Sequence, residues 1–263
     1  METFYLQNGD FKTYIANIKS INDKTNTVLI FLHDSWGCVE MWGDFPYKMV
    51  KLSGLNALLY DRRGYGQSSC VEVMHRTEFY LHDEADELIK VMDLCNIQNA
   101  ILYGHSDGAT IALIAAAKYP QRINGLILEG PHSFIEESGK AAVLATREKV
   151  KETKLLTSLQ KFHGNKTTEL FRLWHETWLG EDFKQWSIVP LLSLIQCPVL
   201  AFQGENDMFG SIEQLNILKQ TIPSSVTISE IADAEHTPRK ESEKYTIDLI
   251  NKWIAENNFI FTK

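Results

Sequence analysis

The chain has 263 residues, of which 44% are hydrophobic and 23% are charged. This composition is typical of a globular protein, and a chain of this length can bury a full core without disulfide or metal staples. The formal net charge of −8 disfavours nucleic acid and anionic membrane surfaces as partners.

Targeting and membrane signals are missing from the sequence. The first residues, METFYLQNGDFK, have neither the basic nor the apolar region of a secretory signal, and no run approaches the ~18 apolar residues of a membrane span. Neither CxxC spacing nor neighbouring histidines accompany Cys38, Cys70, Cys95 and Cys197. We therefore expect a cytoplasmic monomer or homodimer with reduced thiols, a small-molecule substrate, and no metal, cofactor, nucleic acid or membrane partner.

The order of strand and helix patterns predicts an α/β fold. Residues 3–18 predict a β-hairpin around Asn8-Gly9, a pair suited to the positive φ angles of a type I′ turn. Short apolar runs then predict six buried strands, at 27–33, 55–61, 100–104, 123–130, 198–204 and 225–231. Helical periodicity lies between or after them, at 78–95, 107–119 and 242–257. This alternation predicts a mostly parallel, doubly wound sheet.

One long segment interrupts this alternation. Residues 135–195 show two helical patterns, at 139–162 and 166–180, and no strand pattern. A connection of this length inside a compact domain is expected to carry structure and often function. We interpret 135–195 as a helical cap inserted into a core formed by residues 1–134 and 196–263.

A serine between two glycines follows the strand at 100–104. Gly104-His105-Ser106-Asp107-Gly108 has the spacing G-x-S-x-G, and the alanine-rich helix at 107–119 comes directly after it. In this strand–turn–helix context the turn exposes the serine hydroxyl, which favours a nucleophile over a plain Gly-Ser-Gly turn. The backbone N–H of Asp107 then lies at a helix N-terminus, where it can stabilise an oxyanion.

A nucleophilic serine needs a base and an acid that orients the base. In this arrangement the chain order is Ser, Asp or Glu, then His. Asp207 follows the strand at 198–204, and Glu205 in the same loop is a rival that the Gly-x-x-Asp spacing disfavours. His236 follows the last predicted strand, a position that we assign to no other histidine. We expect Ser106, Asp207 and His236 to be catalytic.

The second oxyanion donor should come from the loop after the strand at 27–33. The sequence there is LHDSWG, and we choose the backbone N–H of Ser35, with Asp34 and Trp36 as alternatives. Removal of one oxyanion donor typically lowers the rate by about 10²–10³.

These motifs together resemble the α/β-hydrolase fold superfamily over essentially the whole chain. The resemblance rests on LHDSWG, YDRRGYGQSS, GHSDGAT, GEND and EHTPR. The stretch GHSDGATIALIAAAKYPQRINGLILEGPHSF is similar to bacterial hydrolases and to the valacyclovir hydrolase type of esterase, which implies the same three catalytic residues. YDRRGYGQSS is interpreted as a structural loop. Asp34 departs from the family pattern, which has glycine there, and an acid at this position is expected to bind loop backbone.

The sequence indicates less clearly which residues line the substrate pocket. Asp107 either attracts a cationic group of the substrate or caps the helix that it begins. Cap aromatics either line the pocket or pack the cap on the core; they are Phe162, Phe171, Trp174, Trp178 and Trp186. As pocket residues we select Asp34, Trp36, Asp107, Trp174, Trp178 and Phe209.

The leading hypothesis is a serine hydrolase that cleaves a small carboxylic ester or thioester through an acyl-enzyme. The alternative is a C–C bond hydrolase or lyase of the same fold, which shares the catalytic residues. A ligand-binding member without catalysis is less favoured, because Ser106, Asp207 and His236 are all present. Haloalkane dehalogenases and epoxide hydrolases are disfavoured, because their nucleophile is an aspartate.

Overall fold

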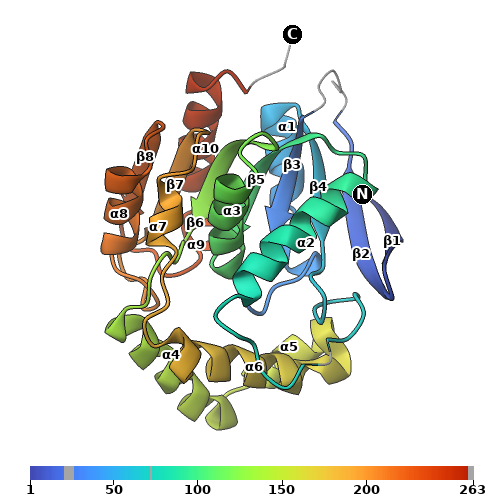
Figure 1. Cartoon of the computed structure of the whole chain (residues 1–263), viewed down its shortest axis with the longest axis vertical. Helices are drawn as coiled ribbons and strands as arrows, with labels where there is room; N and C mark the ends of the chain where they lie inside the picture. The colour runs from blue at the N-terminus through green and yellow to red at the C-terminus, as the bar shows by residue number, and fades with distance from the viewer. Residues whose placement is uncertain (21–26, 72, 260–263) are drawn as a thin grey trace.

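The computed structural model describes residues 1–20, 27–71 and 73–259. Within them, eight strands form one sheet in the spatial order β1-β2-β4-β3-β5-β6-β7-β8 (Figure 1). The strands are β1 (Glu2–Asn8), β2 (Phe11–Ile18), β3 (Thr27–Leu32), β4 (Asn56–Tyr60), β5 (Asn99–His105), β6 (Ile123–Glu129), β7 (Val199–Gly204) and β8 (Val226–Ile231). β2 runs antiparallel to β1 and β4, and the other neighbouring pairs are parallel. The predicted α/β-hydrolase-type sheet is confirmed.

The N-terminal hairpin turns one residue later than predicted. Asn8 pairs with Phe11, so the two loop residues are Gly9 and Asp10. The φ angle is +61° at Gly9, and neither Asn8 nor Asp10 has a positive φ. The prediction of a type I′ turn at Asn8-Gly9 is therefore wrong, because a positive φ at the first loop residue alone is the type II′ pattern.

Helices cover both faces of the sheet. The first face carries α2 (Tyr80–Leu94), α3 (Asp107–Lys118) and α8 (Glu213–Thr221), whose apolar residues share one buried cluster. The opposite face carries α1 (Phe45–Ser53) and α10 (Glu243–Glu256), which contribute to a second cluster. Figure 1 shows α2 and α3 in front of the sheet, with α1 and α10 behind it. The sequence predicted α2, α3 and α10, and did not predict α1 or α8.

Residues 135–195, which we interpret from the sequence as a cap and continue to call the cap, are mostly helical. Its helices are α4 (Glu137–Lys149), α5 (Leu155–His163), α6 (Thr167–Leu179) and α7 (Val189–Leu192). The predicted helix at 139–162 is two helices, separated by a 3₁₀ turn at Val150–Glu152. Figure 1 shows α4, α5 and α6 gathered at one end of the sheet.

Two polar side chains fasten the cap to the core. His163 Nδ1 accepts a hydrogen bond from the Gly66 N–H at 2.9 Å, and its Nε2 lies 2.7 Å from the Trp36 carbonyl oxygen. Lys166 Nζ donates to three backbone carbonyls of the loop at 65–68, at 2.6–3.2 Å. Cap aromatics also belong to the buried cluster on the first face of the sheet. The cap therefore shares its apolar core with the sheet.

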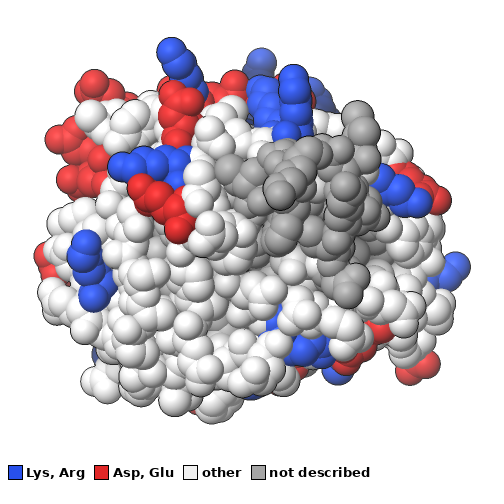
Figure 2. Space-filling model, turned by 90° about the horizontal axis from the view of Figure 1, so that it is seen from above, with Lys and Arg blue, Asp and Glu red and all other residues white. Residues whose placement is uncertain are grey.

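The surface offers no strong field of one charge sign on the face seen in Figure 2. Lysine and arginine side chains there are scattered among aspartate and glutamate side chains. In the part of the chain that the structure describes, every helix is too short or too polar to cross a membrane.

Two glycines let α3 lie against the sheet at the serine turn. A Cβ on Gly108 would overlap the backbone carbonyl of Leu32 at the end of β3, and one on Gly104 would overlap the Gly108 carbonyl. Any side chain larger than hydrogen would force α3 away from β3 and β5. The spacing of the two glycines around Ser106 is thus required by backbone packing.

We predict that Gly108→Ala destabilises the protein. Alanine at a helix position is normally favoured over glycine by about 1 kcal/mol, so propensity alone predicts a gain. The overlap with Leu32 should reverse the sign and cost about 2 kcal/mol, a typical cost of overpacking. Urea denaturation of both proteins measures the difference. A Gly108→Ala protein as stable as the parent would contradict the packing argument.

Candidate active site

A cavity of about 250 Å³ lies between the carboxyl ends of the parallel strands and the cap. In open parallel sheets this edge is where ligands bind. The cavity is lined by Asp34, Ser35, Trp36, His105, Ser106, Asp107, His132, Phe134, Ile135, Glu136, Gly139, Lys140, Val143, Trp174, Trp178, Phe209, His236 and Thr237. All predicted site residues except Asp207 are in this lining.

Ser106 stands at the turn between β5 and α3. Its backbone angles are φ +55° and ψ −118°, a strained combination that residues with a Cβ rarely adopt. Its backbone N–H donates to the Glu129 carbonyl at 2.9 Å, and its carbonyl accepts from Ala109 and Thr110 in the first turn of α3. The neighbouring strand and helix therefore hold the strained residue in place, with Ser106 in the cavity wall.

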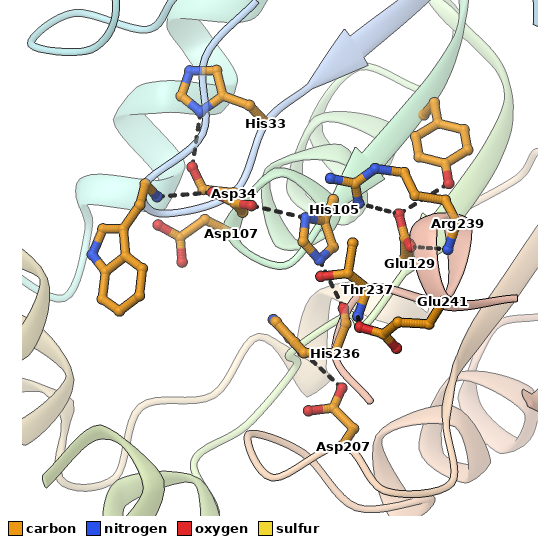
Figure 3. Close-up of polar contacts among 12 residues, drawn as sticks. His33, Asp34, His105, Asp107, Glu129, Asp207, His236, Thr237, Arg239 and Glu241 are labelled. Atoms are coloured by element: carbon orange, nitrogen blue, oxygen red, sulfur yellow. Dashed lines mark hydrogen bonds and ion pairs between the residues drawn. The ribbon is translucent and has the colours of Figure 1, made fainter. Parts of the chain in front are cut away.

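His236 and Asp207 meet at the same edge of the sheet. His236 Nδ1 lies 2.7 Å from Asp207 Oδ2 (Figure 3). Asp207 Oδ1 also accepts a hydrogen bond from the Phe209 N–H at 2.9 Å. Asp207 is buried behind the histidine, and Glu205 is exposed. Of the two acids weighed from the sequence, Asp207 is the one that contacts His236.

The ion pair changes the pKa of both partners. Burial lowers the pKa of His236, but the adjacent Asp207 carboxylate raises it, and the net pKa lies above the ordinary value of 6.5. Burial raises the pKa of Asp207, yet His236 brings it below its ordinary value. Asp207 therefore stays ionised at neutral pH and stabilises a protonated His236.

Ser106 and His236 line the same cavity without a direct hydrogen bond between their side chains in the described structure. Such contacts are often long in the absence of substrate and tighten on binding. His236 is surrounded by other rings: the centroids of Phe209, His105 and His132 lie 4.9, 5.1 and 5.8 Å from its own. These contacts restrict the imidazole to positions close to the serine turn.

Two backbone N–H groups beside Ser106 are candidates to hold an oxyanion. Across the described residues, the N–H groups of Ser35 and Asp107 donate to no protein acceptor. The Trp36 N–H, by contrast, donates to Asp34 Oδ1 at 2.8 Å, and this occupied donor weakens Trp36 as the alternative. Both Ser35 and Asp107 line the cavity.

Asp34 connects the three loops that surround the cavity. Its Oδ1 accepts from the Trp36 N–H, and its Oδ2 lies 3.0 Å from His105 Nδ1. His105 Nε2 lies 2.9 Å from the backbone oxygen of His236, so this ring bridges Asp34 and the His236 loop (Figure 3). The expected bond from Asp34 to loop backbone is present. The contact with His105 was not anticipated.

A buried ion pair holds the backbone that follows His236. Glu129, at the end of β6, accepts from the Arg239 N–H at 2.8 Å and from Arg239 Nη1 at 2.5 Å, and Tyr103 donates to it at 3.0 Å. Arg239 is the second residue of the short helix α9 (Pro238–Glu241). Burial raises the pKa of Glu129, but Arg239 brings it below its ordinary value. The ionised pair fixes α9, and with it His236, against β6.

Asp107 contacts two side chains that neither hypothesis about its role anticipated. Its Oδ2 accepts a hydrogen bond from the Tyr80 hydroxyl at 3.0 Å and lies 3.7 Å from Arg62 Nη2. Its side chain is only 1% exposed and makes no capping hydrogen bond within the described part of α3. Asp107 is the acidic residue of the first turn of α3, as the helix-terminus hypothesis requires, but its side-chain contacts are with Tyr80 and Arg62. The hypothesis of a substrate cation loses support, because Arg62 already neutralises the carboxylate.

The contacts of the loop at 60–69 agree with the structural role that we expected for it. Asp61 accepts from the N–H groups of Val39 and Gln67, each at 2.6 Å. Arg62 is buried and donates to the Asp34 carbonyl at 2.9 Å. This loop supports the cavity from behind and does not line it.

The cap contributes aromatic walls to the cavity. Trp174 and Trp178 line it, together with Trp36 and Phe209 from the core. The Trp36 and Trp174 rings lie 4.3 Å apart. Phe162, Phe171 and Trp186 are outside the lining. The cap aromatics thus divide between lining and packing.

Several lining residues were not found from the sequence. His132, Phe134, Ile135 and Glu136 come from the segment after β6, and Lys140 and Val143 come from α4. The sequence predicts a site histidine only in the loop after the last strand, where His236 lies, whereas His132 follows β6. The stretch EGPHSF directly after the strand at 123–130 was the signal that pointed to it.

Comparison with known proteins agrees with this arrangement. The family model described as alpha/beta hydrolase fold matches residues 27–174. The chain belongs to the alpha/beta hydrolase fold family. No group of three or more His, Cys, Asp or Glu side chains in the described ranges is arranged to hold a metal ion.

Curated relatives include a serine hydrolase. The chain is 30% identical over 156 residues to "Serine hydrolase BPHL" of Mus musculus, covering 56% of this chain and 52% of that protein. It is 28% identical over 170 residues to the protein of the same name from Homo sapiens, covering 60% and 57%. The matches thus span about half the length of these relatives.

Solved structures share the fold over nearly the whole chain. One is MGS-M2, described as an alpha/beta hydrolase enzyme from a Medee basin deep-sea metagenome library, with a TM-score of 0.74. Its sequence is 17% identical, and the superposition covers 95% of this chain and 97% of that one. At this identity the likeness establishes the fold.

We predict that His236 titrates above 6.5 and that Asp207→Asn lowers its pKa. The neutral asparagine removes the charge that stabilises the protonated ring, while burial continues to favour the neutral ring. NMR of the imidazole signals across a pH series, with His236→Gln to assign the resonance, measures both values. A pKa that is unchanged in the Asp207→Asn protein would show that the pair does not control this histidine.

Proposed function

We propose that the chain is a serine hydrolase that cleaves a small carboxylic ester or thioester through an acyl-enzyme on Ser106. The observation that carries the proposal is the presence of a strained, cavity-facing serine in the same cavity as a histidine paired at 2.7 Å with a buried aspartate. Its membership of the alpha/beta hydrolase fold family and its relatives named serine hydrolase support the same reaction class.

In the first half of the reaction, Ser106 Oγ attacks the ester carbonyl carbon. His236 accepts the serine proton as general base, and Asp207 stabilises the resulting imidazolium. The carbonyl oxygen becomes an oxyanion, for which the free N–H groups of Ser35 and Asp107 are the donors. The C–O or C–S bond then breaks, and His236 gives its proton to the leaving alcohol or thiol.

The second half repeats these steps with water as the nucleophile. His236 accepts a proton from water, and the hydroxide attacks the acyl-Ser106 carbonyl. Collapse of the intermediate releases the carboxylic acid and returns the proton to Ser106. Because a protonated His236 cannot accept a proton, turnover requires a pH above its raised pKa.

The shape and chemistry of the cavity support a small substrate. About 250 Å³ is enclosed, which is near the lower end of typical ligand pockets. Trp36, Trp174, Trp178 and Phe209 give it an apolar wall, suited to a short acyl or alcohol group.

We predict that Ser106→Ala lowers ester hydrolysis by a factor of about 10³ or more, because the nucleophile is lost. The assay uses p-nitrophenyl esters and acyl thioesters from acetyl to octanoyl, with Ser158→Ala, an exposed change on α5, as the matched control. Parent and Ser158→Ala proteins should turn over the short esters equally. Activity that survives in Ser106→Ala, or a parent protein inert on every ester, would overturn the proposed function.

A further inference from the structure

His132 is a polar residue in the cavity wall that the proposed reaction does not use. It follows β6 by three residues, and its backbone carbonyl accepts a 2.7 Å hydrogen bond from Thr110 on α3. The residue is 7% exposed and lines the cavity. Its backbone is therefore fixed, and its side chain is turned towards the space in which a substrate would lie.

The imidazole of His132 is held by rings on two sides. Its centroid lies 5.8 Å from that of His236, with the two planes 28° apart, and 5.5 Å from the Trp178 ring, which meets it edge-on. A ring confined in this way has little rotational freedom. Its nitrogens therefore occupy defined positions close to the catalytic histidine.

Neither ring nitrogen of His132 has a hydrogen-bond partner among the residues that the structure describes. The residue is 7% exposed, yet its ring nitrogens are not among the buried side-chain atoms that lack both a partner and contact with solvent. They are therefore accessible from the cavity, where a bound substrate can supply a hydrogen-bond partner.

The charged groups around the cavity already have partners. Asp34 faces His105 at 3.0 Å, and Asp107 has Tyr80 and Arg62. Two further charged residues of the lining are paired as well: Glu136 accepts from Gln214 at 2.7 Å and from the Ser211 N–H at 3.0 Å, and Lys140 donates to Glu137 at 2.8 Å. Asp107 Oδ1 and the indole N–H groups of Trp36 and Trp178 also lack a partner within the described residues, but these atoms have no contact with solvent, whereas the His132 nitrogens are accessible from the cavity.

The protonation state of His132 defines the partner that it fits. Burial, followed by repulsion from His236, lowers the pKa of His132 to about 4. At neutral pH the ring is uncharged, with one N–H donor and one nitrogen acceptor. A hydroxyl group also donates once and accepts, so it matches this ring, whereas a carboxylate or an ammonium ion gains no charge partner.

We propose that His132 forms a polar subsite that binds a hydroxyl group of the substrate, a few atoms from the reacting carbonyl. The inference rests on the proposed ester hydrolysis and adds its substrate class: short hydroxylated esters. The rest of the wall, with Trp174, Trp178 and Phe209, encloses the carbon chain. A hydroxyl on the acyl side and a hydroxyl on the alcohol side of the ester could each form this hydrogen bond. The experiment below tests the two positions with separate esters.

The test compares three esters of similar size: ethyl butyrate, ethyl 3-hydroxybutyrate and 2-hydroxyethyl butyrate. Acid release, followed with a pH indicator, gives kcat/KM for each. The parent protein should prefer one hydroxylated ester over ethyl butyrate by roughly threefold to tenfold, the range of one neutral hydrogen bond. His132→Phe should remove that preference, so that the ratio of kcat/KM for the hydroxylated ester to kcat/KM for ethyl butyrate falls to about one.

Two further variants keep the test decisive. His132→Gln keeps one donor and one acceptor, so it should retain part of the preference. It also tests the proposal if His132→Phe fails to fold. His175→Phe, a histidine on α6 outside the cavity lining, should retain all of it. Equal kcat/KM for the three esters in the parent, or a preference that survives His132→Phe, overturns the proposal, as does an equal loss on all three esters.

A binding measurement separates this inference from the proposed function. Calorimetry with the Ser106→Ala protein compares the same three esters without turnover. If the parent hydrolyses none of them but Ser106→Ala binds a hydroxylated ester more tightly and His132 is required, the subsite stands and the hydrolase proposal fails. If the parent hydrolyses all three and neither rate nor binding depends on His132, the hydrolase proposal stands and the subsite is refuted.

Discussion

The close approach of α3 to the end of β3 is the constraint on which the rest of the site depends. It exists because Gly104 and Gly108 have no Cβ where one would overlap backbone carbonyls. The approach forces Ser106 into a positive φ, and this conformation directs the residue into the cavity. It also brings the first N–H of α3 next to the loop after β3, so the nucleophile and both proposed oxyanion donors depend on one packing contact.

Polar contacts then fix the parts of the site that come from distant positions in the sequence. The buried ion pair of Glu129 and Arg239 joins β6 to α9, and the contact between Asp34 and His105 joins the β3 loop to the serine turn. Removing one partner of a buried ion pair such as Glu129–Arg239 typically costs about 3–5 kcal/mol, because the other charge is left unpaired. Such pairs hold His236 in a defined position although it lies on a loop. The protein thus uses packing for the serine and ion pairs for the histidine.

Much of this arrangement could be predicted from local patterns. Apolar runs marked the parallel strands, and the glycine spacing marked the serine turn, because both depend on neighbouring residues alone. Helices α1 and α8 were missed because their apolar faces are short. The contact between Asp34 and His105 and the position of His132 depend on which loops meet at the sheet edge, which no local pattern contains. The partners of Asp107 were missed for the same reason, because Arg62 and Tyr80 are distant from it in sequence.

The central claim is that Ser106 is a nucleophile activated by His236. Reaction with a fluorophosphonate, followed by peptide mass spectrometry, tests it without knowledge of the natural substrate. The account predicts one phosphonyl group on the peptide that contains Ser106, and a labelling rate about 10³-fold lower in His236→Ala, which lacks the general base. Labelling at another residue, or a rate on Ser106 that is unchanged by His236→Ala, would contradict the account.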